Sequence, residues 1–240
     1  YVAWSWLAGT TASGSESGNN PAFSSSSNSK AGFSIVSYTG TGAAGTVGHG
    51  CGAIPSYIIV KNRDATDNWA VYYGDNTDYL ILNSNSESTD SAAWWNDTTP
   101  TSSVFTVGTD HAVNADGEKY IAYCFTDIEG YCKAGGLYSG NANADGTYVN
   151  VGFRPAWLMV KAYNNARNFT IYDNKRTPFN LIDGHLHANA DVAEQTGEDE
   201  IDFLSNGFKF RTNEADSNYS GFLYTYLAFA DQPFKYANAK

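Results

Sequence analysis

Hydrophobic and polar residues alternate over short stretches along most of this chain, and clusters of Gly, Asn, Asp and Ser separate those stretches. A period of two is typical of β-strands, because successive side chains point to opposite faces of a sheet. The pattern predicts strands in the first half of the chain at 32–39, 55–61, 69–74, 79–83, 103–108 and 119–126. In the second half it predicts strands at 135–140, 148–151, 156–162, 169–173, 180–183, 201–204, 207–212 and 222–230.

An internal repeat organises these strands. The segment "PSYIIVKNRDATDNWAVY", which begins at Pro55, aligns without a gap with "PAWLMVKAYNNARNFTIY", which begins at Pro155. The offset then grows from 100 to 104 residues, because "YIAYCF" from Tyr120 aligns with "YTYLAF" from Tyr224. We therefore expect an all-β protein with two tandem antiparallel β-sandwich units, jelly-roll or lectin-like, at 32–127 and at 128–240 with a C-terminal tail.

The opening stretch "YVAWSWLAG" matches the final strand of each unit. We expect residues 1–9 to be the last strand of a preceding repeat. Such a strand needs a partner, either upstream chain or another subunit, because an unpaired strand exposes its backbone groups. The stretch 10–31 that follows is rich in Ser, Gly and Asn, a composition that predicts a flexible linker.

Composition and charge exclude several functional classes. Aromatic residues make up 15% of the chain and charged residues only 16%, which indicates a packed fold and not a disordered chain. The formal net charge is −11, and the 14 Lys and Arg residues are scattered, which argues against binding of nucleic acid. No apolar run approaches the roughly 18 residues of a membrane helix, so we expect no membrane insertion. The three cysteines lack metal-like spacing and are expected to be buried.

The stretch "SAAWWNDTTP" is the first candidate binding site. Trp94 or Trp95 offers an aromatic face that could stack on a sugar ring, and Asn96 and Asp97 are suited to bind the sugar hydroxyls. The alternative is that one tryptophan belongs to the core and the other covers it.

A second candidate is a calcium site at "NANADG". Asn141, Asn143 and Asp145 place oxygen-bearing side chains at alternate positions before a glycine, as in the first half of a calcium loop. The acidic residue expected at the twelfth position is missing, because Gly152 stands there. The alternative is a polar turn in which Asn and Asp side chains bind their own backbone.

Two weaker features lie close together in the sequence. The "HLH" at 185–187 would place two imidazoles on one face of a strand, without an evident third zinc ligand. The acidic run "EQTGEDEID" at 194–202 could supply the two carboxylates that glycoside cleavage needs, although charge runs in loops are usually solvated. No nucleotide-binding, serine-hydrolase or metalloprotease motif is present.

The chain resembles a group of bacteriophage virion proteins described as tail-fibre-like. The segments "AGFSIVSYTGTGAAGTVGHG", "AAWWNDTTPTSSVFTVG", "IYDNKRTPFN", "IDFLSNGFKFR" and "LAFADQPFKYANAK", with the two repeat segments, carry this resemblance from about residue 31 to the end. It implies a virion protein that works outside the cell and contacts other virion proteins. By analogy it also implies a homo-oligomer of sister subunits, often a trimer.

The leading hypothesis is a non-enzymatic virion component that contacts a host-surface glycan or receptor through loops at the ends of its sandwiches. The first alternative is a purely architectural fibre or decoration module that binds only sister subunits. The second alternative is a polysaccharide-degrading enzyme, which would need a cleft with two carboxylates.

Overall fold

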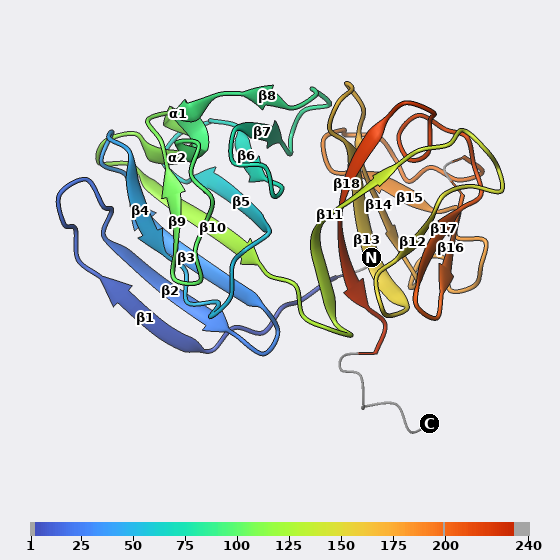
Figure 1. The fold of residues 1–240 in the computed structure, drawn as a ribbon, viewed down its shortest axis with the longest axis horizontal. Coiled ribbons are helices and arrows are strands. Elements are labelled where there is room, and N and C mark those ends of the chain that lie inside the picture. Colours follow the sequence, from blue (N-terminus) through green and yellow to red (C-terminus); the bar gives the residue numbers. More distant parts are fainter. Residues whose placement is uncertain (1–2, 199, 233–240) are drawn as a thin grey trace. The chain divides into compact units, whose positions relative to one another are not determined.

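The computed structural model describes residues 3–198 and 200–232, and it is all-β with antiparallel sheets (Figure 1). This confirms the predicted fold class. The chain divides into two compact units. The N-terminal unit comprises Ser5–Leu82 and Ser88–Asp127, and the C-terminal unit comprises Ile128–Lys240 with Asn83–Glu87 and the start of the chain up to Trp4. Residues 233–240 of the predicted C-terminal tail lie outside the described residues.

The N-terminal unit contains one large sheet with the strand order β1-β2-β3-β10-β5-β6-β7-β8, and a second sheet formed by β4 and β9. Two four-residue helices complete it. Its elements are β1 (Thr10–Gly14), β2 (Phe23–Asn28), β3 (Phe33–Thr39), β4 (Gly45–Gly48), β5 (Tyr57–Asn62), β6 (Trp69–Tyr72), β7 (Asp78–Ile81), β8 (Thr89–Asp90), α1 (Ala92–Trp95), β9 (Val104–Val107), α2 (His111–Asn114) and β10 (Lys119–Phe125).

The C-terminal unit is a sandwich of two sheets, with the strand orders β11-β18-β13-β14-β15 and β12-β17-β16. One buried cluster contains residues from both sheets, such as Leu158 and Tyr224 from the first and Phe208 and Phe210 from the second. The strands are β11 (Cys132–Ser139), β12 (Tyr148–Asn150), β13 (Pro155–Ala162), β14 (Phe169–Asp173), β15 (His185–His187), β16 (Ile201–Leu204), β17 (Gly207–Phe210) and β18 (Leu223–Ala230). The predicted strand at 180–183 is wrong, because this segment forms no strand and Ile182 makes an isolated bridge to Ile201; the strand that follows β14 is β15.

The two larger sheets share a strand order. In the N-terminal unit β3, β10, β5 and β6 are neighbours in that sequence, and in the C-terminal unit β11, β18, β13 and β14 are. The pairing registers correspond as well, since Tyr120 lies opposite Tyr38 and Tyr224 lies opposite Tyr138. These are the positions that the sequence alignment matches, and a tandem repeat would produce this arrangement.

The predicted linker at 10–31 is wrong. The segment contains β1 and β2, and β2 pairs with β3 along its whole length, from Phe23 opposite Tyr38 to Asn28 opposite Phe33. Ser25 and Ser27 pack closely against Gly50, since a Cβ atom on that glycine would lie 3.4 Å and 2.9 Å from their hydroxyls. The serine-rich composition therefore reflects close packing against glycine backbone, and backbone hydrogen bonding compensates for the weak strand propensity.

Residues 3–9 form no strand in the structure, and their assignment to a preceding repeat stays a prediction. Tyr1 and Val2 lie outside the described residues. The alternation reflects ring packing instead: within the N-terminal unit the Trp6 ring lies 6.1 Å from both Phe33 and Phe125. Over the described ranges, no helix has the length and apolar character that crossing a bilayer requires.

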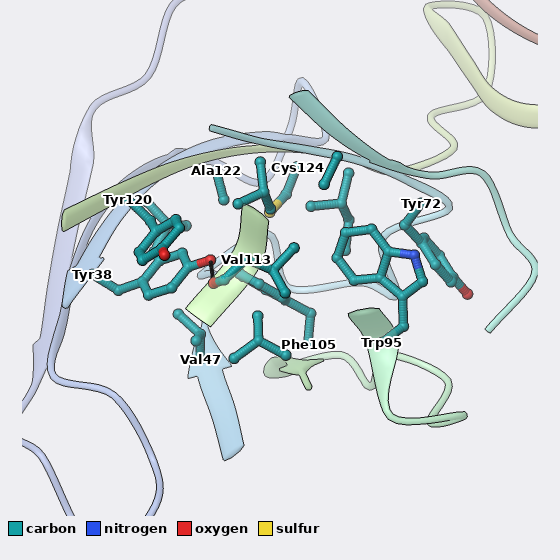
Figure 2. Close-up of a cluster of buried hydrophobic side chains, with 14 of the residues drawn as sticks. Tyr38, Val47, Tyr72, Trp95, Phe105, Val113, Tyr120, Ala122 and Cys124 are labelled. Carbon is teal, nitrogen blue, oxygen red and sulfur yellow. Dashed lines mark hydrogen bonds between the residues drawn. The ribbon is translucent and has the colours of Figure 1, made fainter. Parts of the chain in front are cut away.

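The core of the N-terminal unit lies between the inner face of the large sheet and the β4–β9 pair (Figure 2). Tyr38 and Tyr120 stack there with ring centroids 5.0 Å apart, and the Tyr38 hydroxyl donates to the Val113 carbonyl at 2.6 Å. The C-terminal unit has the same pair, Tyr138 and Tyr224, at 4.8 Å.

In each unit a fully buried asparagine lies between the two paired tyrosines in the sequence, and it binds the loop after β3 or after β11. Asn114 accepts from the Thr41 amide at 2.9 Å and donates to the Ala43 and Gly108 carbonyls at 2.7 Å each. In the C-terminal unit Asn218 accepts from the Asn141 amide at 3.1 Å and donates to the Thr212 carbonyl at 2.8 Å. Buried amides of this kind fix loops, because each polar group of the amide finds a partner without water.

Candidate functional site

The tryptophan pair is not a sugar platform. α1 places both rings in the core, with Trp94 6% exposed and Trp95 2% exposed. Trp94 stacks on Tyr79 with ring centroids 3.6 Å apart, and Trp95 lies edge-on to Tyr72, as Figure 2 shows for the second pair. The prediction failed because these residues form a turn of helix, in which adjacent side chains can both face inward.

Asn96 and Asp97 are exposed in the turn that ends α1, where both have positive φ. The Asn96 amide donates to the Ala92 carbonyl at 2.9 Å and so closes the helix. The predicted binding partners of a sugar thus remain at the surface, while the predicted aromatic platform is buried beneath them.

The predicted calcium ligands form hydrogen bonds and ion pairs with other groups of the protein. The Asn141 side-chain oxygen accepts from the Asn143 amide at 3.0 Å, and the Asn143 side-chain oxygen accepts from the Asp145 amide at 2.9 Å. The Asp145 carboxylate pairs with Lys209 and Arg211, and the hydrogen bond from Lys209 is the main cause that lowers the pKa of Asp145. A divalent cation would have to displace two positive charges, so these residues do not fit calcium.

The two histidines of "HLH" do lie on one face of β15, with ring centroids 5.3 Å apart. His185 is buried, and its Nδ1 lies 3.1 Å from the Asp183 carbonyl. His187 is half-buried, and its Nε2 lies 2.8 Å from the Gln195 side-chain oxygen. Among the described residues no three His, Cys, Asp or Glu side chains gather as a metal ion would require.

The strongest candidate site is a polar cavity of about 290 Å³ in the C-terminal unit, here called the C-terminal cavity. Three segments form it: the loop between β13 and β14, the end of β15 with the stretch that follows it, and the loop between β17 and β18. It is lined by Arg167, Asn168, His187, Ala190, Val192, Gln195, Glu198, Glu214, Ala215 and Asp216. The cavity joins His187 of the "HLH" motif to Gln195 and Glu198 of the acidic run.

Hydrogen bonds hold the lining side chains in place. The Asp216 carboxylate accepts from the Asn168 side-chain amide at 2.8 Å, and the Asn168 side-chain oxygen accepts from Asn189 at 2.8 Å. The Asn189 side-chain oxygen in turn accepts from the Phe169 amide at 2.8 Å, so the network ends on the backbone of β14. A ligand would therefore meet polar groups that are already oriented, which lowers the entropic cost of binding.

The charge of the cavity is negative. Glu198, Glu214 and Asp216 contribute carboxylates, whereas Arg167 supplies the guanidinium. The Arg167 Nε is buried without a hydrogen-bond partner among the described residues, and the guanidinium lies 5.5 Å from the centre of the Phe222 ring. The lining therefore offers three carboxylates as hydrogen-bond acceptors against a single guanidinium.

A buried lysine lies within the electrostatic range of this cavity. Lys161 on β13 is 1% exposed, and its ammonium donates to the backbone carbonyls of Ala162 at 2.6 Å and Asn165 at 3.2 Å. Burial lowers the pKa of Lys161 to about 7, while the Asp216 carboxylate acts in the opposite direction. The proton on Lys161 is thus released near neutral pH.

Sequence reasoning missed Arg167, Asn168, Asn189 and Asp216, because they come from separate loops. One signal was present in the repeat: Arg167 aligns with Asp67, and Asp216 aligns with Ala112 at the offset of 104 residues. Positions where the two aligned sequence segments differ in charge mark places where one segment can have its own chemistry.

Comparison with models of protein families assigns the chain to a family. A search of curated proteins and a search of solved structures find no match. The model of the family described as "Domain of unknown function (DUF7483)" matches residues 1–233. Since this match covers nearly the whole length, the chain belongs to the DUF7483 family.

Proposed function

We propose that this protein is a non-enzymatic virion component of the tail-fibre type, which contacts a neutral host-surface glycan through the C-terminal cavity. The observation that carries the proposal is the pre-oriented polar lining of that cavity. Carboxylate and amide groups are the side chains that bind sugar hydroxyls, and a few convergent polar groups beside apolar ones are typical of small-ligand sites. Val192, 50% exposed, supplies apolar surface at the rim.

The charge of the cavity supports a neutral ligand over an acidic one. Three carboxylates face one guanidinium, and the protein as a whole carries a formal net charge of −11. An acidic sugar would approach against this field. The resemblance of the repeat segments to phage virion proteins supports a role outside the cell, on the particle.

Binding to a glycan array and to candidate host cells tests this proposal. Wild-type protein should bind neutral glycans, and Asp216→Ala combined with Gln195→Ala should weaken that binding at least tenfold. Asp97→Asn, an exposed carboxylate in the N-terminal unit, is the matched control and should bind like the wild type. Equal binding by the cavity variant, once circular dichroism shows that it is folded, would reject the C-terminal cavity as the site.

The same samples distinguish a non-enzymatic glycan-binding protein from an enzyme that cleaves the glycan. Glu198 and Glu214 both line the cavity, and glycoside hydrolases use two carboxylates. Release of reducing ends from a polysaccharide that the protein binds would identify an enzyme and overturn the non-enzymatic assignment.

A second candidate function is an architectural module that binds sister subunits in a homo-oligomer or other virion proteins. It is favoured by Leu137 on β11, which is 60% exposed, and by Leu223 on β18, which is 37% exposed. β11 is the edge strand of its sheet, and an apolar edge is a ready surface for strand pairing. Sedimentation of the wild type and of Leu137→Ser tests it: a wild-type oligomer that dissociates in the variant would support this function.

A further inference from the structure

A second cavity lies in the N-terminal unit, and its chemistry is opposite to that of the C-terminal cavity. It has a volume of about 260 Å³ and is here called the basic cavity. It is lined by Ala22, Phe23, Ser24, Ser37, Tyr38, Thr39, Arg63, Lys119 and Tyr120. Two of the 14 cationic side chains of an acidic protein converge on it, and no carboxylate belongs to the lining.

The basic cavity is built on the outer face of the large sheet, where β2, β3 and β10 lie side by side. Lys119 is paired with Thr39 in the ladder, and the Arg63 amide donates to the Lys119 carbonyl at 2.7 Å. The hydroxyl group of Ser37 lies on the same face and donates to the Ser24 carbonyl at 3.4 Å. Both cationic residues thus belong to hydrogen-bonded backbone, which fixes the spacing of their Cα atoms.

The two cations have no anionic partner. Neither the Arg63 guanidinium nor the Lys119 ammonium forms an ion pair among the described residues, and both side chains are exposed. The carboxylates nearest to them in the sequence accept hydrogen bonds from other groups. Asp64 accepts from the Lys119 backbone amide at 2.9 Å, and Glu118 accepts from the Asn62 side chain.

The C-terminal unit shows that the fold does not need these charges. Arg63 aligns with Tyr163 at the offset of 100 residues, and Lys119 aligns with Leu223 at the offset of 104. The contact between them is kept, since the Tyr163 amide donates to the Leu223 carbonyl at 2.9 Å. The basic pair is therefore a property of the N-terminal unit alone, and a structural role does not explain it.

We propose that the basic cavity binds the anionic group of a small hydroxylated ligand, a carboxylate or phosphate carried by a single sugar residue. The guanidinium pairs with two oxygens of the anion, and the ammonium supplies a second positive charge. Ser24, Ser37 and Thr39 provide hydroxyls for the ring. The volume admits about one sugar residue, because it falls just below the range of roughly 300–1,000 Å³ found for drug-sized ligands.

The test is a titration of ¹⁵N-labelled full chain at low salt, followed by amide chemical shifts, with glucuronate, glucose 6-phosphate and glucose as probes. Both anions should shift the amides of residues 22–24, 37–39, 63 and 119–120, and glucose should leave those amides unmoved. Raising the salt should weaken binding, because the contact is electrostatic and exposed. A response to only one of the two anions would support the site and assign its ligand to carboxylates or to phosphates.

Arg63→Gln with Lys119→Gln should weaken binding of the anions at least tenfold. Lys30→Gln removes an exposed lysine of the same unit outside the basic cavity and should change nothing. Equal binding by the double variant, or shifts spread over all lysines, would overturn the proposal. Because the readout is local to the N-terminal unit, it is independent of whether the C-terminal cavity binds a neutral glycan.

Discussion

Replacing Asn114 with Ala should destabilise the N-terminal unit by about 4–6 kcal/mol. The side chain is 0% exposed and makes three hydrogen bonds, to Thr41, Ala43 and Gly108. Each contributes about 1 kcal/mol net, and a buried group left without a partner costs roughly 1–3 kcal/mol more. The Gly108 carbonyl is buried and will bear that cost, whereas water can reach the half-buried Thr41 and Ala43.

The assay is urea unfolding followed by tryptophan fluorescence, which reports on the N-terminal unit through the buried Trp94 and Trp95 and on the C-terminal unit through the buried Trp157. Asn150→Ala is the control, because within the described part of the chain that exposed side chain accepts a single hydrogen bond, from the Gly152 amide. Its loss should cost under about 1 kcal/mol. A loss below about 1 kcal/mol for Asn114→Ala would refute the reasoning that the amide holds the loop together.

Asn114→Asp sharpens the test. The acid keeps an acceptor for the Thr41 amide but turns an oxygen toward the carbonyls of Ala43 and Gly108. Burial then raises the pKa of the new carboxyl in the folded state, so its penalty grows as pH rises from about 4. We expect Asn114→Asp to be at least as unstable as Asn114→Ala at pH 7, and to recover part of the difference near pH 4.

Three further outcomes are expected. Because the pKa of Lys161 is lowered to about 7 in the folded protein from 10.5, the unfolded chain binds more protons between these values, and stability should rise with pH there. Unfolding free energy should gain about 2 kcal/mol between pH 7 and 9 relative to Lys161→Met, and parallel pH profiles would contradict this. Tyr224→Phe removes a hydroxyl that bonds the Tyr219 amide and the Ala215 carbonyl at 2.9 Å each; thermal unfolding should show a loss of about 1–3 kcal/mol, and glycan binding at the C-terminal cavity should weaken. Calcium at 1 mM should leave the melting temperature unchanged, because Asp145 is already paired with Lys209 and Arg211, and a clear rise would show that the pairing is displaced.

Strands with alternating side chains could be predicted from the sequence, and those with small side chains could not. The predictions at 119–126 and 169–173 lie within a residue of β10 and of β14. β2 was missed because "FSSSSN" has no hydrophobic alternation, and its position depends on a ladder with β3 and on the glycine backbone beside it. Such tertiary requirements are invisible to a local pattern.

The candidate site was harder to predict for a related reason. All lining residues of the C-terminal cavity except His187, which ends β15, lie in loops, where no periodicity links sequence to position. His187 and Glu198 could be singled out by type, but their meeting with Asp216 depends on how β14, β15 and β18 are ordered in space. The prediction for Trp94 and Trp95 failed for a different reason. Their residue type suggested a sugar-binding surface, but the short helix α1 places both side chains in the core.

The pairing of β2 with β3 has a practical consequence for dissecting this protein. A recombinant fragment that begins at residue 31, after the serine tract, would retain the predicted repeat and lose the hairpin of β1 and β2. The seven residues of β3 would then present unpaired amides and carbonyls beside Phe33 and Ile35, a template for aggregation through strand addition. Fragments of the N-terminal unit should therefore begin before Thr10, and a tag or label is better placed upstream of that hairpin than inside it.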